Sequence, residues 1–222
     1  MSDSKNILII VTNHNQIDAD HQTGLWLEEF AIPYQLFREK TYTITVASPK
    51  GGMAPIDPRS MPKPEEVEQY GAALQALQYT EPLSSVNIDQ FDAVFFPGGH
   101  GTMYDLPVAE VGQVVSRFLD AQKIVAAVCH GPAALVNATQ SDGTPVVKGR
   151  KVTGFTDQEE QEVELAELMP FLLESRLREL GAEFDAAPNW QDHVIVDGNL
   201  ITGQNPQSSG SGAKAVIEAL SK

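Results

Sequence analysis

The sequence predicts an α/β fold in which helices cover both faces of a mostly parallel, doubly wound sheet. Short apolar runs rich in β-branched residues alternate along the chain with longer segments of helical periodicity, which is the order of βαβ units. Several of these runs are continuously apolar, as strands buried on both faces of a parallel sheet are. No internal repeat or linker divides the 222 residues, so we expect residues 1–222 to form a single domain.

The first half of the chain begins as strand, helix, strand, the opening of a right-handed βαβ unit. These elements are expected at residues 6–11, 23–39 and 43–47. Pro33 should break or kink the helix, because proline has no amide hydrogen and its ring clashes with the preceding turn. Residues 49–64 are rich in Gly and Pro and predict a surface excursion, and residues 64–78 predict a short amphipathic helix. We expect residues 49–78 to be an insertion that covers a pocket.

The alternation of strands and helices continues to the end of the chain. Strands are expected at residues 93–96, 123–128, 152–153, 194–196 and 200–202, and helices at 108–121, 132–137, 161–180 and 213–220. Pro170 predicts an interruption of the long helix, and Gly181 predicts its end. The last two strands flank Asp197-Gly198-Asn199, which is typical of a hairpin.

Composition and charge narrow the classes of partner. A formal net charge of -15 makes nucleic acid and anionic membrane surfaces poor partners, because binding to phosphate relies on clustered Lys and Arg. No apolar run is long enough to cross a bilayer, and the amino terminus lacks the pattern of an export signal. We therefore expect a cytoplasmic protein with no nucleic-acid or membrane partner. Its single cysteine cannot form an intramolecular disulfide.

That cysteine, Cys129, directly follows a predicted strand. Ligands of open α/β sheets bind beyond the carboxyl ends of the strands, and Ala127-Val128-Cys129-His130-Gly131 has the small residues that a nucleophile elbow requires. The helix that follows should lower the pKa of the thiol, and the N–H groups of Gly99 and His130 could stabilise an oxyanion. A lone cysteine is more often a buried structural residue, but the adjacent histidine and the facing Gly98-Gly99 turn favour catalysis or redox sensing.

Motifs spread over nearly the whole chain accompany Cys129. They are Thr23-Gly24 through Glu29 to Pro33, Gly98-Gly99-His100-Gly101-Thr102, Ala126-Ala127-Val128-Cys129-His130-Gly131-Pro132, Thr153-Gly154-Phe155-Thr156-Asp157 and Thr202-Gly203-Gln204-Asn205-Pro206. Together they resemble the motifs of the DJ-1/PfpI superfamily, and within it those of the Hsp31-like branch that includes fungal glutathione-independent glyoxalases. The Cys-His-Gly-Pro core with the Gly-Gly-His-Gly loop is far more specific than a lone glycine motif.

The resemblance implies a flavodoxin-like three-layer sandwich, related to class I glutamine amidotransferases, with Cys129 as elbow nucleophile and His130 as its base. It also implies an acidic residue that orients the imidazole, and Glu160 holds the matching position. Asp157 and Glu159 lie close by, and an acidic run is typical of a solvated helix start, so these alternatives stay open. The resemblance further implies a homodimer and no cofactor.

Family members place a glutamate from the first crossover helix against the thiol, and the matching residue is Glu29. Adjacent helical positions point about 100 degrees apart, so only one of Glu28 and Glu29 can face the pocket. Burial beside a thiolate would raise the pKa of Glu29 and allow it to carry a proton near neutrality. We expect Glu29 to face inward and Glu28 to face solvent.

Other polar and aromatic residues are weaker candidates for the site. One loop contains residue types that bind metals, but their spacing fits no defined metal site. We therefore predict no metal and interpret the loop as a polar loop of the active site. These residues are His14, Asp18, Asp20 and His21. Trp26 and His100 are expected to contact substrate, although an apolar residue at helical spacing such as Trp26 is more often a core residue, and His100 could equally be a cap.

The function that the resemblance implies is that of a cofactor-independent glyoxalase. Such an enzyme converts a small reactive aldehyde, methylglyoxal or glyoxal, to a 2-hydroxy acid through a hemithioacetal on Cys129. Two alternatives stay open. One is a stress-associated holding chaperone or protein-repair factor, which needs exposed apolar surface and no nucleophile. The other is an intracellular cysteine peptidase or amidase, which a Cys-His-acid arrangement permits and which needs a wide groove.

Overall fold

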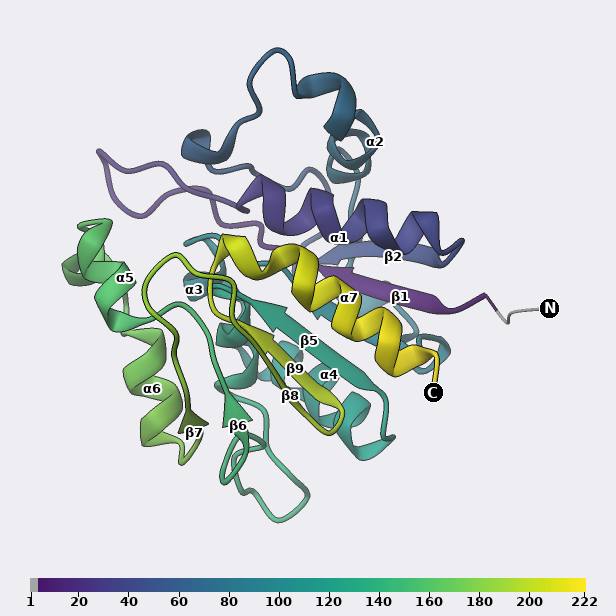
Figure 1. Ribbon diagram of the computed structural model, residues 1–222, viewed down its shortest axis with the longest axis vertical. Helices are drawn as coiled ribbons and strands as arrows, with labels where there is room; N and C mark the ends of the chain where they lie inside the picture. Colours follow the sequence, from purple (N-terminus) through teal and green to yellow (C-terminus); the bar gives the residue numbers. More distant parts are fainter. Residues whose placement is uncertain (1–3) are drawn as a thin grey trace.

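The computed structural model describes residues 4–222 and shows a seven-stranded sheet between two layers of helices (Figure 1). The strands are β1 (Asn6–Ile10), β2 (Thr43–Ser48), β3 (Glu81–Pro82), β4 (Ala93–Phe96), β5 (Ile124–Val128), β8 (Val194–Asp197) and β9 (Leu200–Gly203). Their order is β3-β2-β1-β4-β5-β9-β8, and every neighbouring pair is parallel except β8 and β9. The predicted α/β sandwich is therefore confirmed.

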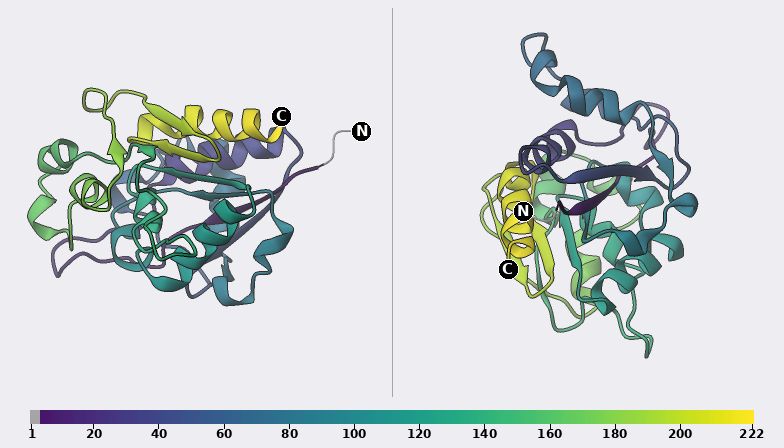
Figure 2. Two further views of the ribbon diagram at one scale, coloured as in Figure 1. Left: turned by 90° about the horizontal axis from the view of Figure 1, so that it is seen from below. Right: turned by 90° about the vertical axis from the view of Figure 1, so that its right-hand side faces the viewer.

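The strands bury side chains on both faces, as their continuous apolar sequences predict. In β1, Ile7 and Ile9 face one core while Leu8 and Ile10 face the other, because successive side chains of a strand point to opposite sides. Helices α1 (Leu27–Glu39) and α7 (Ser209–Leu220) lie side by side over the first core, and α2 (Val67–Leu77) packs against α1. Helix α4 (Ala109–Asp120) covers the second core, with the short α3 (Thr102–Asp105) before it (Figure 2).

The segment after β5 differs from the sequence prediction in its helices. Residues 131–135 form a 3-10 helix, where an ordinary helix was expected at 132–137. The single helix expected at 161–180 is divided into α5 (Asp157–Glu162) and α6 (Leu173–Glu179), which agrees with the interruption that Pro170 predicts. A small second sheet joins β6 (Lys151–Val152) to β7 (Glu183–Phe184). Within residues 4–222, no helix is both long and apolar enough to span a membrane.

The break that Pro33 could cause in its helix does not occur. Helix α1 runs unbroken through Pro33 from Leu27 to Glu39. The proline costs the helix one hydrogen bond, the one that its missing N–H would donate to the carbonyl of Glu29. Phe30 and Phe37, on either side of it, are fully buried against the sheet, so tertiary packing stabilises the helix on both sides of the proline.

Candidate active site

Cys129 lies on a sharp turn directly after β5. Its φ of 58° is in the left-handed region that non-glycine residues rarely adopt, and its N–H donates to the carbonyl of Gly203 at 2.9 Å. The turn leaves no room for a side chain at Gly131, where a Cβ would lie 2.1 Å from the carbonyl oxygen of Phe96. This is the geometry of a nucleophile elbow, and it explains the small residue two positions after the cysteine.

The expected lowering of the Cys129 pKa is wrong. The thiol is only 3% exposed, and burial raises its pKa well above the ordinary value; the nearby carboxyl of Glu29 raises it further. The N–H of His130 lowers this pKa but does not outweigh burial. A 3-10 helix of five residues follows the turn, in place of the longer helix whose dipole was expected to favour the thiolate.

Glu29 comes from the first turn of α1 and is fully buried, whereas the adjacent Glu28 is exposed. Its Oε2 accepts a hydrogen bond from the N–H of Gly98 at 2.6 Å. Its Oε1 has no well-aligned partner among residues 4–222, although the thiol of Cys129 lies within interaction range. Burial raises the pKa of Glu29 from 4.5 to about 8, and the interactions of its carboxyl group with the Cys129 thiol and the Gly98 N–H offset this only in part. The carboxyl group can therefore hold or release a proton near neutrality.

His130 lies between the thiol and a carboxylate. Its Nδ1 is 3.3 Å from Sγ of Cys129, and its Nε2 is 2.6 Å from Oε2 of Glu160. Burial raises the pKa of Glu160, but contacts with His130 and His100 outweigh burial and hold the pKa well below its usual range. An ionised Glu160 fixes a proton on Nε2 of His130, so the free lone pair on Nδ1 faces the thiol.

The other two acidic residues considered for this contact lie elsewhere. Asp157 accepts from the backbone and side chain of Ser175. Glu159 is buried and accepts from the side chains of Gln204 and Asn205, which ties α5 to the segment after β9. Among the three, Glu160 is the one that contacts the imidazole, at the position that the family resemblance indicates.

His100 also binds Glu160, which the sequence did not predict. Its Nε2 is 2.6 Å from Oε1, so the two histidines share one carboxylate, and their ring centroids are 4.2 Å apart. Arg59, from the segment between β2 and α2, donates to Nδ1 of His100 at 3.1 Å. No periodicity or motif in the sequence distinguishes Arg59 from an ordinary surface arginine.

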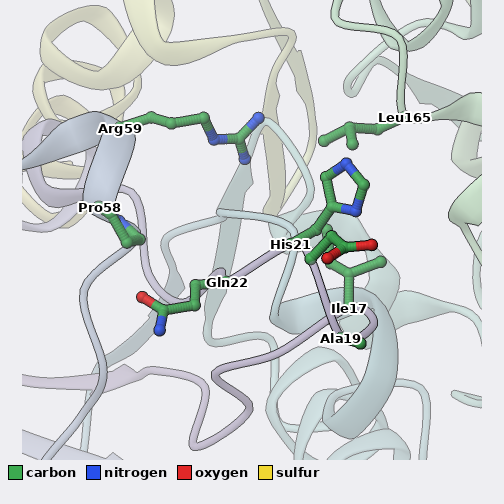
Figure 3. A pocket seen from close by; sticks show the side chains of 8 residues that line it. Ile17, Ala19, His21, Gln22, Pro58, Arg59 and Leu165 are labelled. Atoms are coloured by element: carbon green, nitrogen blue, oxygen red, sulfur yellow. The ribbon is translucent and has the colours of Figure 1, made fainter.

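Cys129 and His130 line a small cavity of about 60 Å³, whereas Glu29 and Glu160 lie behind them and are not part of its lining. Its lining comes from several parts of the chain: Trp26, Arg59, Gly99, His100, Cys129, His130, Phe155, Val163, Trp190 and Pro206. The predicted residues Trp26, Gly99 and His100 thus line the same cavity as the thiol, while Phe155 and Trp190 were not predicted. Arg59 also lines a second hollow of about 400 Å³, together with His21 and Leu165. Figure 3 shows the side chains that line this second hollow.

The two N–H groups expected to form an oxyanion hole both lie at this cavity. Gly99 has a φ of 99°, and a Cβ there would lie 2.3 Å from the carbonyl oxygen of Gly24, so only glycine fits. Within residues 4–222 its N–H has no hydrogen-bond acceptor, and that of His130 has only the sulfur. Both donors are thus available to an oxygen bound beside Cys129.

One cluster of metal-ligand residue types lies at the site, formed by His100, His130 and Glu160, with ligand atoms within 4.8 Å of one another. Each Nε2 is 2.6 Å from a carboxylate oxygen, a distance spanned by a proton and too short for an intervening ion. In the polar loop, His21 binds Asp18, whereas His14 binds the carbonyl of Gln16. We retain the absence of a metal as a prediction.

Comparison with known proteins gives consistent matches along the chain. A family model described as the DJ-1/PfpI family matches residues 22–219. The glutathione-independent glyoxalase hsp3101 of Schizosaccharomyces pombe is 36% identical over 213 residues, which cover 88% of this chain and 87% of the relative. The crystal structure of glyoxalase III from Candida albicans has a TM-score of 0.89 at 30% identity, covering 97% of both chains. Rapid Encystment Protein 24 kDa of Francisella tularensis has a TM-score of 0.92 at 36% identity, covering 97% of this chain and 99% of that one.

Proposed function

This chain belongs to the DJ-1/PfpI family, and we propose that it is a cofactor-independent glyoxalase that converts methylglyoxal or glyoxal to the corresponding 2-hydroxy acid. The observation that carries the proposal is the pairing of the Cys129 thiol with Glu29, whose pKa is raised to about 8 by burial. The reaction needs one nucleophile and one group that moves a proton between carbon atoms. The relatives named glutathione-independent glyoxalase and glyoxalase III support the same activity.

The first step adds the sulfur to the aldehyde carbon. The S–H proton passes to Nδ1 of His130, which is 3.3 Å away, and the resulting imidazolium is stabilised by the ionised Glu160. The carbonyl oxygen becomes an oxyanion that accepts from the N–H groups of Gly99 and His130. The proton on His130 then moves to this oxygen and gives a neutral hemithioacetal. A buried thiol with a raised pKa requires this proton transfer, because it is not ionised beforehand.

The second step moves a hydrogen within the bound substrate. The carboxylate of Glu29 removes the proton from the former aldehyde carbon, and the electron pair moves onto the second carbonyl oxygen, which gives an enediolate. Glu29 then returns the proton to the adjacent carbon, while the hydroxyl proton of the former aldehyde carbon moves to the oxygen of that adjacent carbon, which leaves the thioester of the 2-hydroxy acid. A carboxyl group with a pKa near 8 is a stronger base than an ordinary glutamate and still a competent acid afterwards. Water cleaves the thioester, which releases the 2-hydroxy acid and restores the thiol; overall one water molecule is consumed and no oxidant is needed.

The size of the cavity favours a small aldehyde over a peptide. A volume of about 60 Å³ accommodates a molecule of a few non-hydrogen atoms, whereas a peptidase needs a groove for an extended chain. The lining of the cavity includes the aromatic side chains of Trp26, Phe155 and Trp190, which limit access of water to the enediolate. We therefore place the small-aldehyde reaction ahead of peptide hydrolysis.

The test is formation of D-lactate from methylglyoxal by the purified protein without glutathione. We expect turnover by the wild type and loss of turnover in Cys129→Ala, with the exposed Glu28→Gln as a variant that keeps its activity. Absence of lactate with the wild type would refute the proposed activity. Normal turnover by Cys129→Ala would instead refute the covalent mechanism.

A further inference from the structure

Arg59 is held in place by three contacts. Its Nε and Nη2 donate to the two carboxylate oxygens of Asp57 at 3.0 and 2.7 Å, and its guanidinium lies 5.7 Å from the ring centroid of Trp26. Asp57 is fully buried and also accepts from the hydroxyl of Thr23. The arginine is therefore a fixed donor and not a mobile surface side chain.

The contact between Arg59 and His100 determines where the histidine carries its proton. Arginine has only donors, so Nδ1 of His100 must be the acceptor at 3.1 Å. The single ring proton then lies on Nε2, from which it is donated to Oε1 of Glu160 at 2.6 Å. A second proton on Nδ1 would point at the guanidinium and would place two positive groups in contact.

We propose that Arg59 is a positioning residue that keeps His100 neutral, so that the proton released by Cys129 is carried by His130 alone. The proposal deepens the proposed function and rests on it for the role of that proton. Both histidines bind Glu160, and their ring centroids are only 4.2 Å apart. If His100 were an imidazolium, its charge would neutralise Glu160 and repel a second imidazolium at His130.

The charged and titratable groups that face His100 come from three parts of the chain. Glu160 lies on α5, His130 follows β5, and Arg59 lies between β2 and α2. Cys129 contacts His130 and completes the set. Burial lowers the pKa of His100 to about 4, assisted by the charges of His130 and Arg59 and opposed by Glu160. Glu160 is therefore the one group in this set that favours a charged His100.

The principal variant is Arg59→Met, which keeps an unbranched side chain but removes every donor. Loss of Arg59 lets Nδ1 of His100 take up a proton as the pH falls. The acidic limb of the plot of kcat/KM against pH should therefore shift to higher pH by about one unit. The activity relative to wild type should therefore fall about tenfold at low pH and much less at high pH. Arg59→Lys restores a cationic donor and should move the limb back toward wild type.

The proton position is measured directly by nitrogen-15 spectroscopy of the histidine rings, because protonated and unprotonated ring nitrogens have very different chemical shifts. We expect wild-type His100 to show a proton on Nε2 only across the neutral range, and Arg59→Met to show protonation of Nδ1 at a pH about one unit higher than in the wild type. This readout needs no substrate. It therefore tests the proposal about His100 even if the protein proves inactive toward methylglyoxal.

Two controls distinguish loss of the contact between Arg59 and His100 from a general loss of folding stability. Arg59→Met leaves the buried carboxylate of Asp57 without its charged partner, which destabilises the fold, so the double variant with Asp57→Asn is prepared in parallel. Arg117 forms an exposed pair with Asp89 at 2.6 Å, and Arg117→Met is the matched control that should behave as wild type. The proposal is overturned if activity falls by the same factor at every pH, or if His100 keeps its Nε2 proton alone in both Arg59→Met proteins.

Discussion

Replacing Glu29 by Gln should make the protein more stable at alkaline pH while abolishing its chemistry. The pKa of Glu29 is raised from 4.5 to about 8 by complete burial, so the folded state holds this proton more tightly than the unfolded state does. Between these two pH values the unfolded chain has lost the proton and the folded chain has kept it. The stability that the protonated carboxyl group contributes is therefore fully present below the pKa of Glu29 in the unfolded chain. It is lost as the pH rises through the pKa of Glu29 in the folded protein.

The size of this pH effect on the free energy of unfolding follows from the difference in proton binding between the folded and unfolded states. Each pH unit between the two pKa values lowers the free energy of unfolding by about 1.4 kcal/mol. Between pH 5 and pH 8 the free energy of unfolding of the wild type should therefore fall by roughly 4 kcal/mol through Glu29 alone. A neutral glutamine keeps an acceptor for the N–H of Gly98 and has no charge to desolvate. The free energy of unfolding of Glu29→Gln should therefore fall less steeply with pH, and kcat should drop by about 100-fold or more because the proton carrier is gone.

The assay is urea denaturation of both proteins at a series of pH values from about 5 to 8.5. Every other titrating group is common to the two proteins, so the difference between the curves isolates Glu29 and its coupling to Cys129. Glu28→Gln changes the neighbouring exposed carboxylate and serves as the matched control, with wild-type slope and activity. Parallel curves for wild type and Glu29→Gln would refute the reasoning, because they would mean that Glu29 titrates normally in the folded protein.

Three further outcomes are expected. Gly131→Ala should lower the free energy of unfolding by about 2 kcal/mol or more, because its Cβ would lie 2.1 Å from the carbonyl oxygen of Phe96; a melting temperature equal to wild type would contradict the elbow geometry. Glu159→Ala should destabilise by roughly 2–4 kcal/mol, since the buried amides of Gln204 and Asn205 lose their acceptor, and unchanged urea midpoints would count against this contact. Sedimentation equilibrium should give the mass of a homodimer, as the family resemblance implies, and a mass of 24.1 kDa at all concentrations would exclude it.

The sequence by itself determined the elements whose signals are local. Continuous apolar runs predicted strands β1, β4 and β5, and Asp197-Gly198-Asn199 predicted the hairpin of β8 and β9. The elbow around Cys129 was also readable, because the turn imposes small residues at fixed offsets. Helical geometry allowed only one of two adjacent glutamates to face inward, and the motif indicated which one.

Tertiary structure decided everything that depends on segments distant in the chain. Pro33 lies inside α1 because packing on both sides outweighs one missing hydrogen bond. The Cys129 pKa is raised and not lowered, since desolvation depends on what surrounds the thiol and not on the residues beside it in sequence. Arg59 contacts His100, which is 41 positions further along the chain, and no local pattern encodes that contact. Local propensities follow from neighbouring residues, whereas burial, charge pairing and proton positions follow from the folded arrangement.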